Sequence, residues 1–181
     1  FTMLLSDIAS ECSELGIITY DRLIPLFKRS FPNANIFGTK HLKKRSIDPS
    51  KWDVQVAMGS IPMLRFPTLK DYKNLSPYLI VEQEQKLEFT KRFNLAQRPD
   101  LIGFSWKGGG NAKQKRTKSL QLIDLLPLFR ASDKRWISLQ YGDVSQELKE
   151  FNQQHNLELL NAEDVNPLKD MDRWCALVSC C

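Results

Sequence analysis

The chain has 181 residues, 42% of them hydrophobic, which is enough to bury a core and to form one domain or two small ones. Its 26 Lys and Arg residues against 21 Asp and Glu residues give a formal net charge of +5, a mild excess that favours phosphorylated ligands without requiring nucleic acid. No apolar run is long enough to predict a membrane span, and the four cysteines lack CxxC spacing, so we expect no zinc site or disulfide framework and a reducing cytoplasmic location.

The N-terminal part of the chain alternates helix-like and strand-like segments. Apolar residues at helical spacing predict a helix over residues 3–14, and β-branched residues predict a strand over residues 16–20. Asp21 can cap a second helix, which the sequence FPNAN ends before a short apolar strand at residues 36–37. Residues 52–59, WDVQVAMG, predict a further buried strand. Strands that alternate with helices imply a parallel sheet.

The middle of the chain predicts a division into two halves. Residues 60–77 contain three prolines and no sustained period, which indicates a long ordered loop, and a charged segment of helical bias follows. We therefore expect a partial N-terminal Rossmann-like half over residues 1–78, a crossing over residues 79–99 and a partial C-terminal Rossmann-like half over residues 100–181.

The C-terminal half restarts the alternation of strands and helices. The expected elements are a strand at 101–106, a turn at 107–118, a helix at 119–129, a strand at 136–141, a helix at 145–156, a short apolar segment at 157–160 and a helix opened by Asn166 and Pro167. This order predicts an α/β fold with a doubly wound layout. Because the first residue is Phe1 and the last helical segment has no closing Gly, Pro or polar tail, we expect a fragment of a larger protein.

The turn at residues 107–118 has the most distinctive local sequence. It holds three consecutive glycines and five cations, with no acidic residue between Asp100 and Asp124. In an open parallel sheet, ligands bind beyond the carboxyl ends of the strands, where glycines let backbone N–H groups approach a phosphate. Lys and Arg add charge-assisted hydrogen bonds, and Ser119 or Thr117 could cap the next helix or reach a phosphate. The turn therefore predicts a diphosphate site, although a solvated loop without a ligand fits the same composition.

Several other kinds of site are disfavoured. The turn matches neither the P-loop nor the dinucleotide-binding pattern, and the segment from Gly103 to Lys107 lacks the closing glycine of a hydrolase nucleophile elbow. His41 and His155 have no acidic or Cys neighbour at metal-ligand spacing, so we predict no metal site. The basic HLKKR cluster at residues 41–45 contains no interleaved aromatic residue, which makes nucleic acid an unlikely partner.

Motifs spread along most of the chain resemble a known family. The segments IGFSWKGGG, KQKRTKSLQLIDLLPLF and RWISLQYGD, with DRLIPLFKRSFPN and WDVQVAMGSIP upstream, occur in the same order in the glycosyltransferase-like region that follows tetratricopeptide repeats in many bacterial proteins. That region is related to heptosyltransferases and more distantly to O-linked N-acetylglucosamine transferases. The resemblance implies a GT-B arrangement of two Rossmann-like halves, with a nucleotide-sugar donor held mainly by the C-terminal half.

The resemblance also implies site residues on two loops of the C-terminal half. The first loop would face the cleft, its cations would meet the donor diphosphate, and the second loop would follow the next strand. These residues are Ser105, Trp106, Lys107, Gly108, Gly109, Gly110, Lys113 and Arg116 on the first loop, and Gln140, Tyr141 and Gly142 on the second. Catalytic residues stay unassigned, and no cofactor is expected besides the nucleotide-sugar substrate.

Two departures from the family pattern limit what this chain would do alone. The glycine-aspartate loop expected before Phe1 and the Asp-x-x-x-x-His-Leu-like segment expected after Cys181 are not in the sequence. We therefore expect a glycosyltransferase fragment that is inactive by itself, with a protein or glycan as the acceptor. The alternative is a non-catalytic interaction or carbohydrate-binding module that keeps the same fold.

Overall fold

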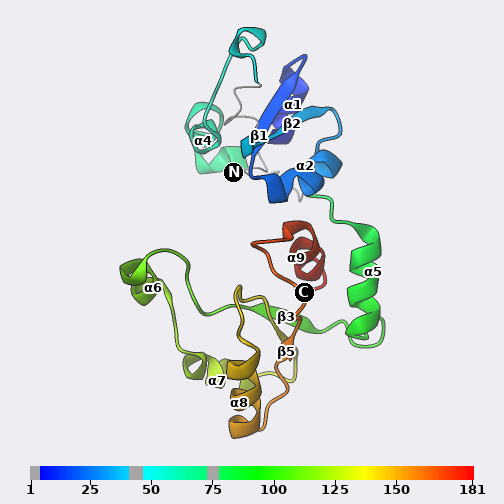
Figure 1. Cartoon of the computed structure of the whole chain (residues 1–181), viewed down its shortest axis with the longest axis vertical. Coiled ribbons are helices and arrows are strands. Elements are labelled where there is room, and N and C mark those ends of the chain that lie inside the picture. Colours follow the sequence, from blue (N-terminus) through cyan, green and yellow to red (C-terminus); the bar gives the residue numbers. More distant parts are fainter. Residues whose placement is uncertain (1–4, 41–46, 73–77) are drawn as a thin grey trace. The chain divides into compact units, whose positions relative to one another are not determined.

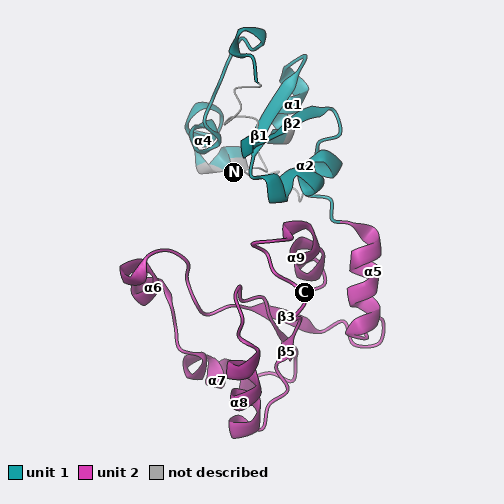
Figure 2. Cartoon of the chain, in the orientation of Figure 1, with its two compact units in different colours: residues 1–81 teal, residues 82–181 magenta. Residues whose placement is uncertain are grey.

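A computed structural model of the chain describes residues 5–40, 47–72 and 78–181. The chain separates into two compact units, residues 1–81 and residues 82–181 (Figure 2). Both units are mixed α/β, and each contains a small parallel sheet within its described residues, which confirms the predicted α/β class. Among the described helices, none combines the length and the apolar character that crossing a membrane requires.

The first unit is built around two parallel strands (Figure 1). Its described regular elements are α1 (Leu5–Glu11), β1 (Leu15–Thr19), η2 (Asp21–Leu23), α2 (Ile24–Ser30), β2 (Ala34–Gly38), η3 (Pro49–Lys51), η4 (Met58–Ser60), α4 (Ile61–Arg65) and η5 (Leu69–Tyr72). Strands β1 and β2 pair in register from Leu15 opposite Ala34 to Thr19 opposite Gly38. The apolar faces of α1, β1, α2 and α4 meet in one core cluster. The helix–strand–helix–strand order expected from the sequence is therefore present.

The strand expected at residues 52–59 is absent, and that prediction was wrong. The segment after Trp52 runs without a strand partner among the described residues, with Val54 81% and Val56 41% exposed. Alternating apolar residues suit a strand only when a neighbouring backbone supplies hydrogen bonds. Trp52 instead anchors the segment through its ring, which lies edge-on to Phe37 with centroids 6.1 Å apart. The loop expected at residues 60–77 likewise contains the helical turns α4 and η5 within its described part.

The second unit contains three parallel strands in the order β3-β4-β5. Its elements are α5 (Gln83–Arg92), β3 (Leu101–Phe104), α6 (Ala112–Lys118), η6 (Leu122–Leu125), α7 (Leu126–Arg130), β4 (Arg135–Ser138), α8 (Ser145–His155), β5 (Leu160–Asn161) and α9 (Met171–Val178). Because all three strands run the same way, their carboxyl ends lie at one edge of the sheet. The loops that follow β3 and β4 are those predicted to hold the ligand.

An aromatic core holds the sheet of the second unit together. Phe104 of β3 packs edge-on to Phe129 of α7, with ring centroids 4.9 Å apart, and Phe129 packs in the same way on Trp136 of β4 at 5.3 Å. Leu148 and Phe151 on the inner face of α8 complete this cluster. Pairs of this geometry add to the free energy gained from burial of the rings, so β3 and β4 present their loops from a fixed base.

Several predicted boundaries in this unit were wrong. The strands expected over residues 101–106 and 136–141 end at Phe104 and Ser138, and the helix expected over residues 119–129 begins only at Leu122. The turn expected over residues 107–118 becomes a helix from Ala112, because Asn111 and Gln114 form a capping box at 2.9–3.0 Å. The last helix begins at Met171 rather than at Pro167, because Asp170 accepts a hydrogen bond from the Arg173 backbone N–H at 2.9 Å.

Candidate functional site

The loop that follows β3 is anchored by a buried tryptophan. Trp106 is 3% exposed and stacks on Phe104 with ring centroids 5.5 Å apart, because residues two apart on an extended chain point to the same face. Ser105 between them is exposed. Trp106 was expected to face the ligand; it lies in the aromatic core and fixes the point at which the basic loop leaves the sheet.

Gln140, on the loop after β4, holds the two loops together. Its side-chain oxygen accepts hydrogen bonds from the backbone N–H groups of Trp106 at 3.0 Å and Lys107 at 2.8 Å. Its side-chain nitrogen donates to the carbonyl oxygens of Lys107 at 3.2 Å and Tyr141 at 3.3 Å. Gln140 is 8% exposed, so these bonds satisfy a buried amide on all sides. Gln140 shapes the site through the backbone of its neighbours.

Gly108 is the point where the loop closes on itself. A Cβ at this position would lie 2.6 Å from the Cβ and 2.9 Å from the carbonyl oxygen of Lys118, so only glycine allows the end of α6 to come back against the loop. The Gly108 N–H donates to Ser119 Oγ at 3.0 Å, and its carbonyl oxygen accepts from the Tyr141 hydroxyl at 3.0 Å. Ser119 therefore closes the loop rather than capping the next helix.

Helix α6 carries most of the positive charge of this region. Figure 1 shows it set apart from the sheet and joined to it by two extended segments, and all seven of its residues are exposed. Gly110, with φ of +115°, makes the bend that precedes it. Because nothing packs over α6 within the described residues, its cationic side chains face solvent.

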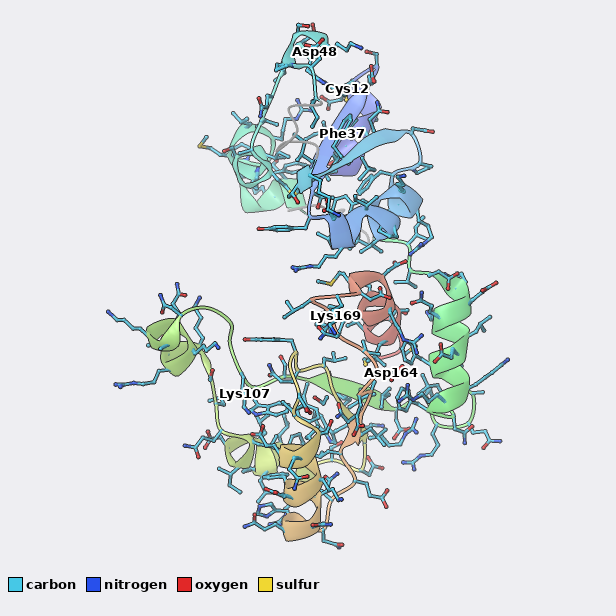
Figure 3. All side chains as sticks on the ribbon, in the orientation of Figure 1. Cys12, Phe37, Asp48, Lys107, Asp164 and Lys169 are labelled. Atoms are coloured by element: carbon cyan, nitrogen blue, oxygen red, sulfur yellow. The ribbon has the colours of Figure 1, made fainter. Side chains whose placement is uncertain are left out.

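The two loops and helix α6 border an open hollow of about 410 Å³, which we name the basic recess. It lies beyond the carboxyl end of β3, where Figure 3 labels Lys107 on the segment that leads to α6. Cations, a hydroxyl-bearing side chain from each loop and the Gln140 amide face it together. The lining residues are Lys107, Gly108, Lys115, Arg116, Ser119, Leu120, Gln140 and Tyr141. The cations and the Ser119 hydroxyl can donate to the oxygens of a phosphate, whereas the Gln140 amide and the Tyr141 hydroxyl already donate to backbone carbonyls.

A second hollow of about 350 Å³, which we name the polar hollow, lies beyond the carboxyl ends of β4 and β5. Carboxylates, amides and hydroxyls dominate its wall, together with the Trp174 ring of α9. The lining residues are Ser138, Leu139, Gln140, Gly142, Asp143, Ser145, Asn161, Ala162, Glu163, Val165, Asn166, Trp174 and Leu177. Gln140 lines both hollows, so the two lie next to each other along one edge of the sheet.

An ion cluster fixes one wall of the polar hollow. Asp164, labelled in Figure 3, accepts hydrogen bonds from Arg173 at 2.6 Å and Arg92 at 2.7 Å. Partial burial opposes ionisation, but these two guanidinium groups outweigh it and lower the pKa of Asp164 to about 2. Arg173 also forms a bidentate pair with Glu88 of α5 at 2.7 Å, and its hydrogen bond lowers the pKa of Glu88. The cluster ties α5 and α9 to the segment that carries Glu163 and Val165.

Comparisons with protein-family models, with curated proteins and with solved structures found no match. The chemistry of the two hollows is therefore what bears on function.

The structure brings six of the predicted site residues to the two hollows. Lys107, Gly108, Arg116, Gln140 and Tyr141 line the basic recess, while Gly142 and again Gln140 line the polar hollow. The other five line neither hollow: Trp106 is buried, and the exposed ones are Ser105, Gly109, Gly110 and Lys113.

Other residues at the two hollows were not among the predicted site residues. Lys115 was noted only as one of the five cations of the basic turn, and Ser119 only as a side chain that could cap a helix or reach a phosphate, and both line the basic recess. Asp143 follows a strand end in the sequence QYGD, which was a weaker signal for the polar hollow. Glu163 and Trp174 reach it from segments that no local motif marks.

The remaining candidates from the sequence are the metal-ligand types, the two histidines and the basic HLKKR cluster. Among the described residues, no three His, Cys, Asp or Glu side chains are grouped so as to hold a metal ion. His155 packs on Phe151 with ring centroids 4.4 Å apart. His41 and the HLKKR cluster lie outside the described residues.

Proposed function

We propose that residues 82–181 form the donor-binding half of a glycosyltransferase that uses a nucleotide sugar. The observation that carries this proposal is the pair of hollows that share Gln140 at the carboxyl edge of one parallel sheet. One hollow is basic and the other is rich in hydrogen-bond acceptors. A nucleotide sugar has a diphosphate joined to hydroxyl-bearing sugar rings, and these two parts need surroundings of those two kinds.

The basic recess suits the diphosphate. Lys115 and Arg116 supply full positive charges, and neither has an ion-pair partner among the described residues. Ser119 adds a hydroxyl that accepts from the Gly108 N–H and can still donate its own hydrogen to a phosphate oxygen. When the bond between sugar and diphosphate breaks, the leaving group gains negative charge, and cations fixed at this place stabilise that charge.

The polar hollow suits the nucleoside part of the same donor. The carboxylates of Asp143 and Glu163 accept hydrogen bonds from ribose hydroxyls, as acidic residues at strand ends do in other parallel α/β folds. The Trp174 ring offers an apolar surface for a base. A donor that spans both hollows would pass beside Gln140.

On this proposal the chain is part of a GT-B enzyme with two Rossmann-like halves. Residues 1–81 would then belong to the acceptor half, because they contain a parallel sheet with flanking helices of their own. The motifs that resemble the tetratricopeptide-associated glycosyltransferases of bacteria support this view. The catalytic base is not assigned to any residue of this chain.

Calorimetric titration of the chain with ADP, UDP and GDP tests the proposal. Saturable binding of one of them is expected, and Arg116→Ala and Lys115→Ala should each weaken it by roughly tenfold, the value of one charge-assisted hydrogen bond. Lys113→Ala is the matched control, because Lys113 carries the same charge on the same helix without lining the recess. Its affinity should stay within twofold of the unsubstituted chain.

Three results would contradict the proposal. One is the absence of saturable binding of all three nucleotides. A second is an equal loss of affinity in Lys113→Ala and Lys115→Ala, which would indicate unspecific attraction to a charged helix. A third is saturable binding of a free sugar in the polar hollow without any nucleotide binding, which would support the carbohydrate-binding module instead.

A further inference from the structure

Lys107, the first cation of the basic recess, is paired inside the protein. Its ammonium group forms an ion pair with Glu147 in the first turn of α8. The other carboxylate oxygen of Glu147 accepts a hydrogen bond from the indole nitrogen of Trp106 at 3.3 Å. The ammonium also lies 5.5 Å from the centre of the Trp106 ring, within the range of a cation–π contact. Lys107 is thus held at the rim of the recess by two neighbouring groups, the Glu147 carboxylate and the Trp106 ring.

Glu147 differs from the other groups near the recess because it carries a negative charge beside a site built from cations. It is placed there by α8, whose inner face is fixed in the aromatic core by Leu148. The hydrogen bond from the Trp106 indole nitrogen also holds the Glu147 carboxylate on the side of α8 that faces Lys107. Both side chains are partly exposed, Lys107 to 44% and Glu147 to 36%, so a ligand in solution can reach the pair.

We infer that Glu147 is an internal counterion that sets the affinity of the basic recess for phosphate. This inference rests on the proposed function of the recess. In the empty site Glu147 neutralises Lys107 and keeps its side chain ordered. A bound diphosphate replaces the Glu147 carboxylate as the ion-pair partner of Lys107. The displaced carboxylate stays nearby and repels the diphosphate. Glu147 is in this sense a positioning residue, which acts through Lys107 and touches no ligand itself.

Two physical consequences follow from such an exchange. Because the Lys107–Glu147 ion pair is lost when the ligand binds, the affinity of the recess for phosphate is lower than its cations would give without Glu147. Because a singly charged anion offers little more attraction than the carboxylate it replaces, the exchange favours ligands with several charges, such as a diphosphate. The counterion thereby keeps the recess from filling with simple salts.

The variant Glu147→Gln tests this role with little change in shape. Glutamine keeps an oxygen that can accept the Trp106 indole hydrogen and removes only the charge. Glu150→Gln is the matched control: Glu150 lies on the same helix, is exposed and bonds to Gln146, and it lines neither hollow. Both variants change the net charge by the same amount.

The measurement is calorimetric titration of inorganic pyrophosphate into the chain, into both variants, into Lys107→Ala and into the double variant Lys107→Ala/Glu147→Gln. Glu147→Gln should bind about three- to tenfold more tightly than the unsubstituted chain, the size expected for a partly exposed charge contact. Glu150→Gln should change the affinity less than twofold. The gain from Glu147→Gln should vanish when Lys107 is absent, because the exchange needs that side chain.

A second readout follows Lys107 directly. Acetylation of its ammonium by a limiting amount of acetic anhydride, measured by mass spectrometry, should be faster in Glu147→Gln than in the unsubstituted chain. Pyrophosphate should slow it in both proteins. This readout distinguishes the counterion role from a purely structural one, which would change the unfolding temperature without changing these rates.

The outcomes separate this inference from the function on which it rests. If the unsubstituted chain binds pyrophosphate and Glu147→Gln binds no more tightly, the inference is overturned and the phosphate site stands. An equal gain with and without Lys107 would show simple repulsion and would also overturn it. If neither the unsubstituted chain nor Glu147→Gln binds pyrophosphate, both the inference and the proposed function fail.

Discussion

Replacing Gln140 with methionine should destabilise the second unit, because Gln140 joins its two loops. Methionine has a similar length and no hydrogen-bonding amide. The backbone N–H groups of Trp106 and Lys107 would both lose their acceptor. The N–H of Trp106 belongs to a buried residue, so water cannot replace that acceptor. A buried N–H without a partner costs about 1–3 kcal/mol, and the more accessible bond to Lys107 about 1 kcal/mol, so we expect a loss of about 2–4 kcal/mol in the free energy of unfolding.

Urea denaturation followed by tryptophan fluorescence measures this loss. Trp106 and Trp136 lie in the aromatic core of the second unit and report its unfolding. Gln153→Met is the matched control, because Gln153 is exposed on α8 and the same substitution there should change the stability by less than about 0.5 kcal/mol. A loss of less than about 1 kcal/mol in Gln140→Met, on the scale of an ordinary surface change, would refute the role given to Gln140.

Two further predictions concern the loop closure and the ion cluster. Gly108→Ala places a methyl group 2.6 Å from the Lys118 Cβ, so it should cost about 1–3 kcal/mol of unfolding free energy and weaken nucleotide binding, whereas a neutral effect on both would contradict the closure described for the loop. Because the pKa of Asp164 is lowered in the folded state to about 2 from its ordinary value of 3.8, its ion cluster contributes stability above pH 4 that disappears as the pH falls toward 2. Since Asp164 is partly exposed, we expect this contribution to be on the order of 1 kcal/mol after solvent screening. Acid titrations followed by circular dichroism measure it. Between pH 4 and pH 2, the Asp164→Asn variant should lose less stability than the unsubstituted chain.

The sequence alone predicted where two strands of the second unit lie, although not where they end. The segments 101–106 and 136–141 were expected to be strands, and the strands observed there are Leu101–Phe104 and Arg135–Ser138. Because parallel strands place their carboxyl ends together, the basic turn and the QYG segment were expected at one edge, and the basic recess brings them together. The segment at residues 52–59 shows the limit of such patterns, since alternation cannot tell whether a backbone partner exists.

What only the tertiary structure decided is how each side chain at that edge is used. Trp106 was assigned to the ligand, although its two-residue spacing from Phe104 already favoured the core. Gln140 was expected to contact the ligand. Its side-chain oxygen instead accepts hydrogen bonds from the backbone of the basic loop, 33 and 34 residues earlier in the chain. The ion pair of Lys107 with Glu147 spans 40 residues. Local sequence patterns report on neighbours along the chain. These contacts depend instead on the packing of α8 and β4 against β3. That packing decides which charges of the basic turn can bind a ligand.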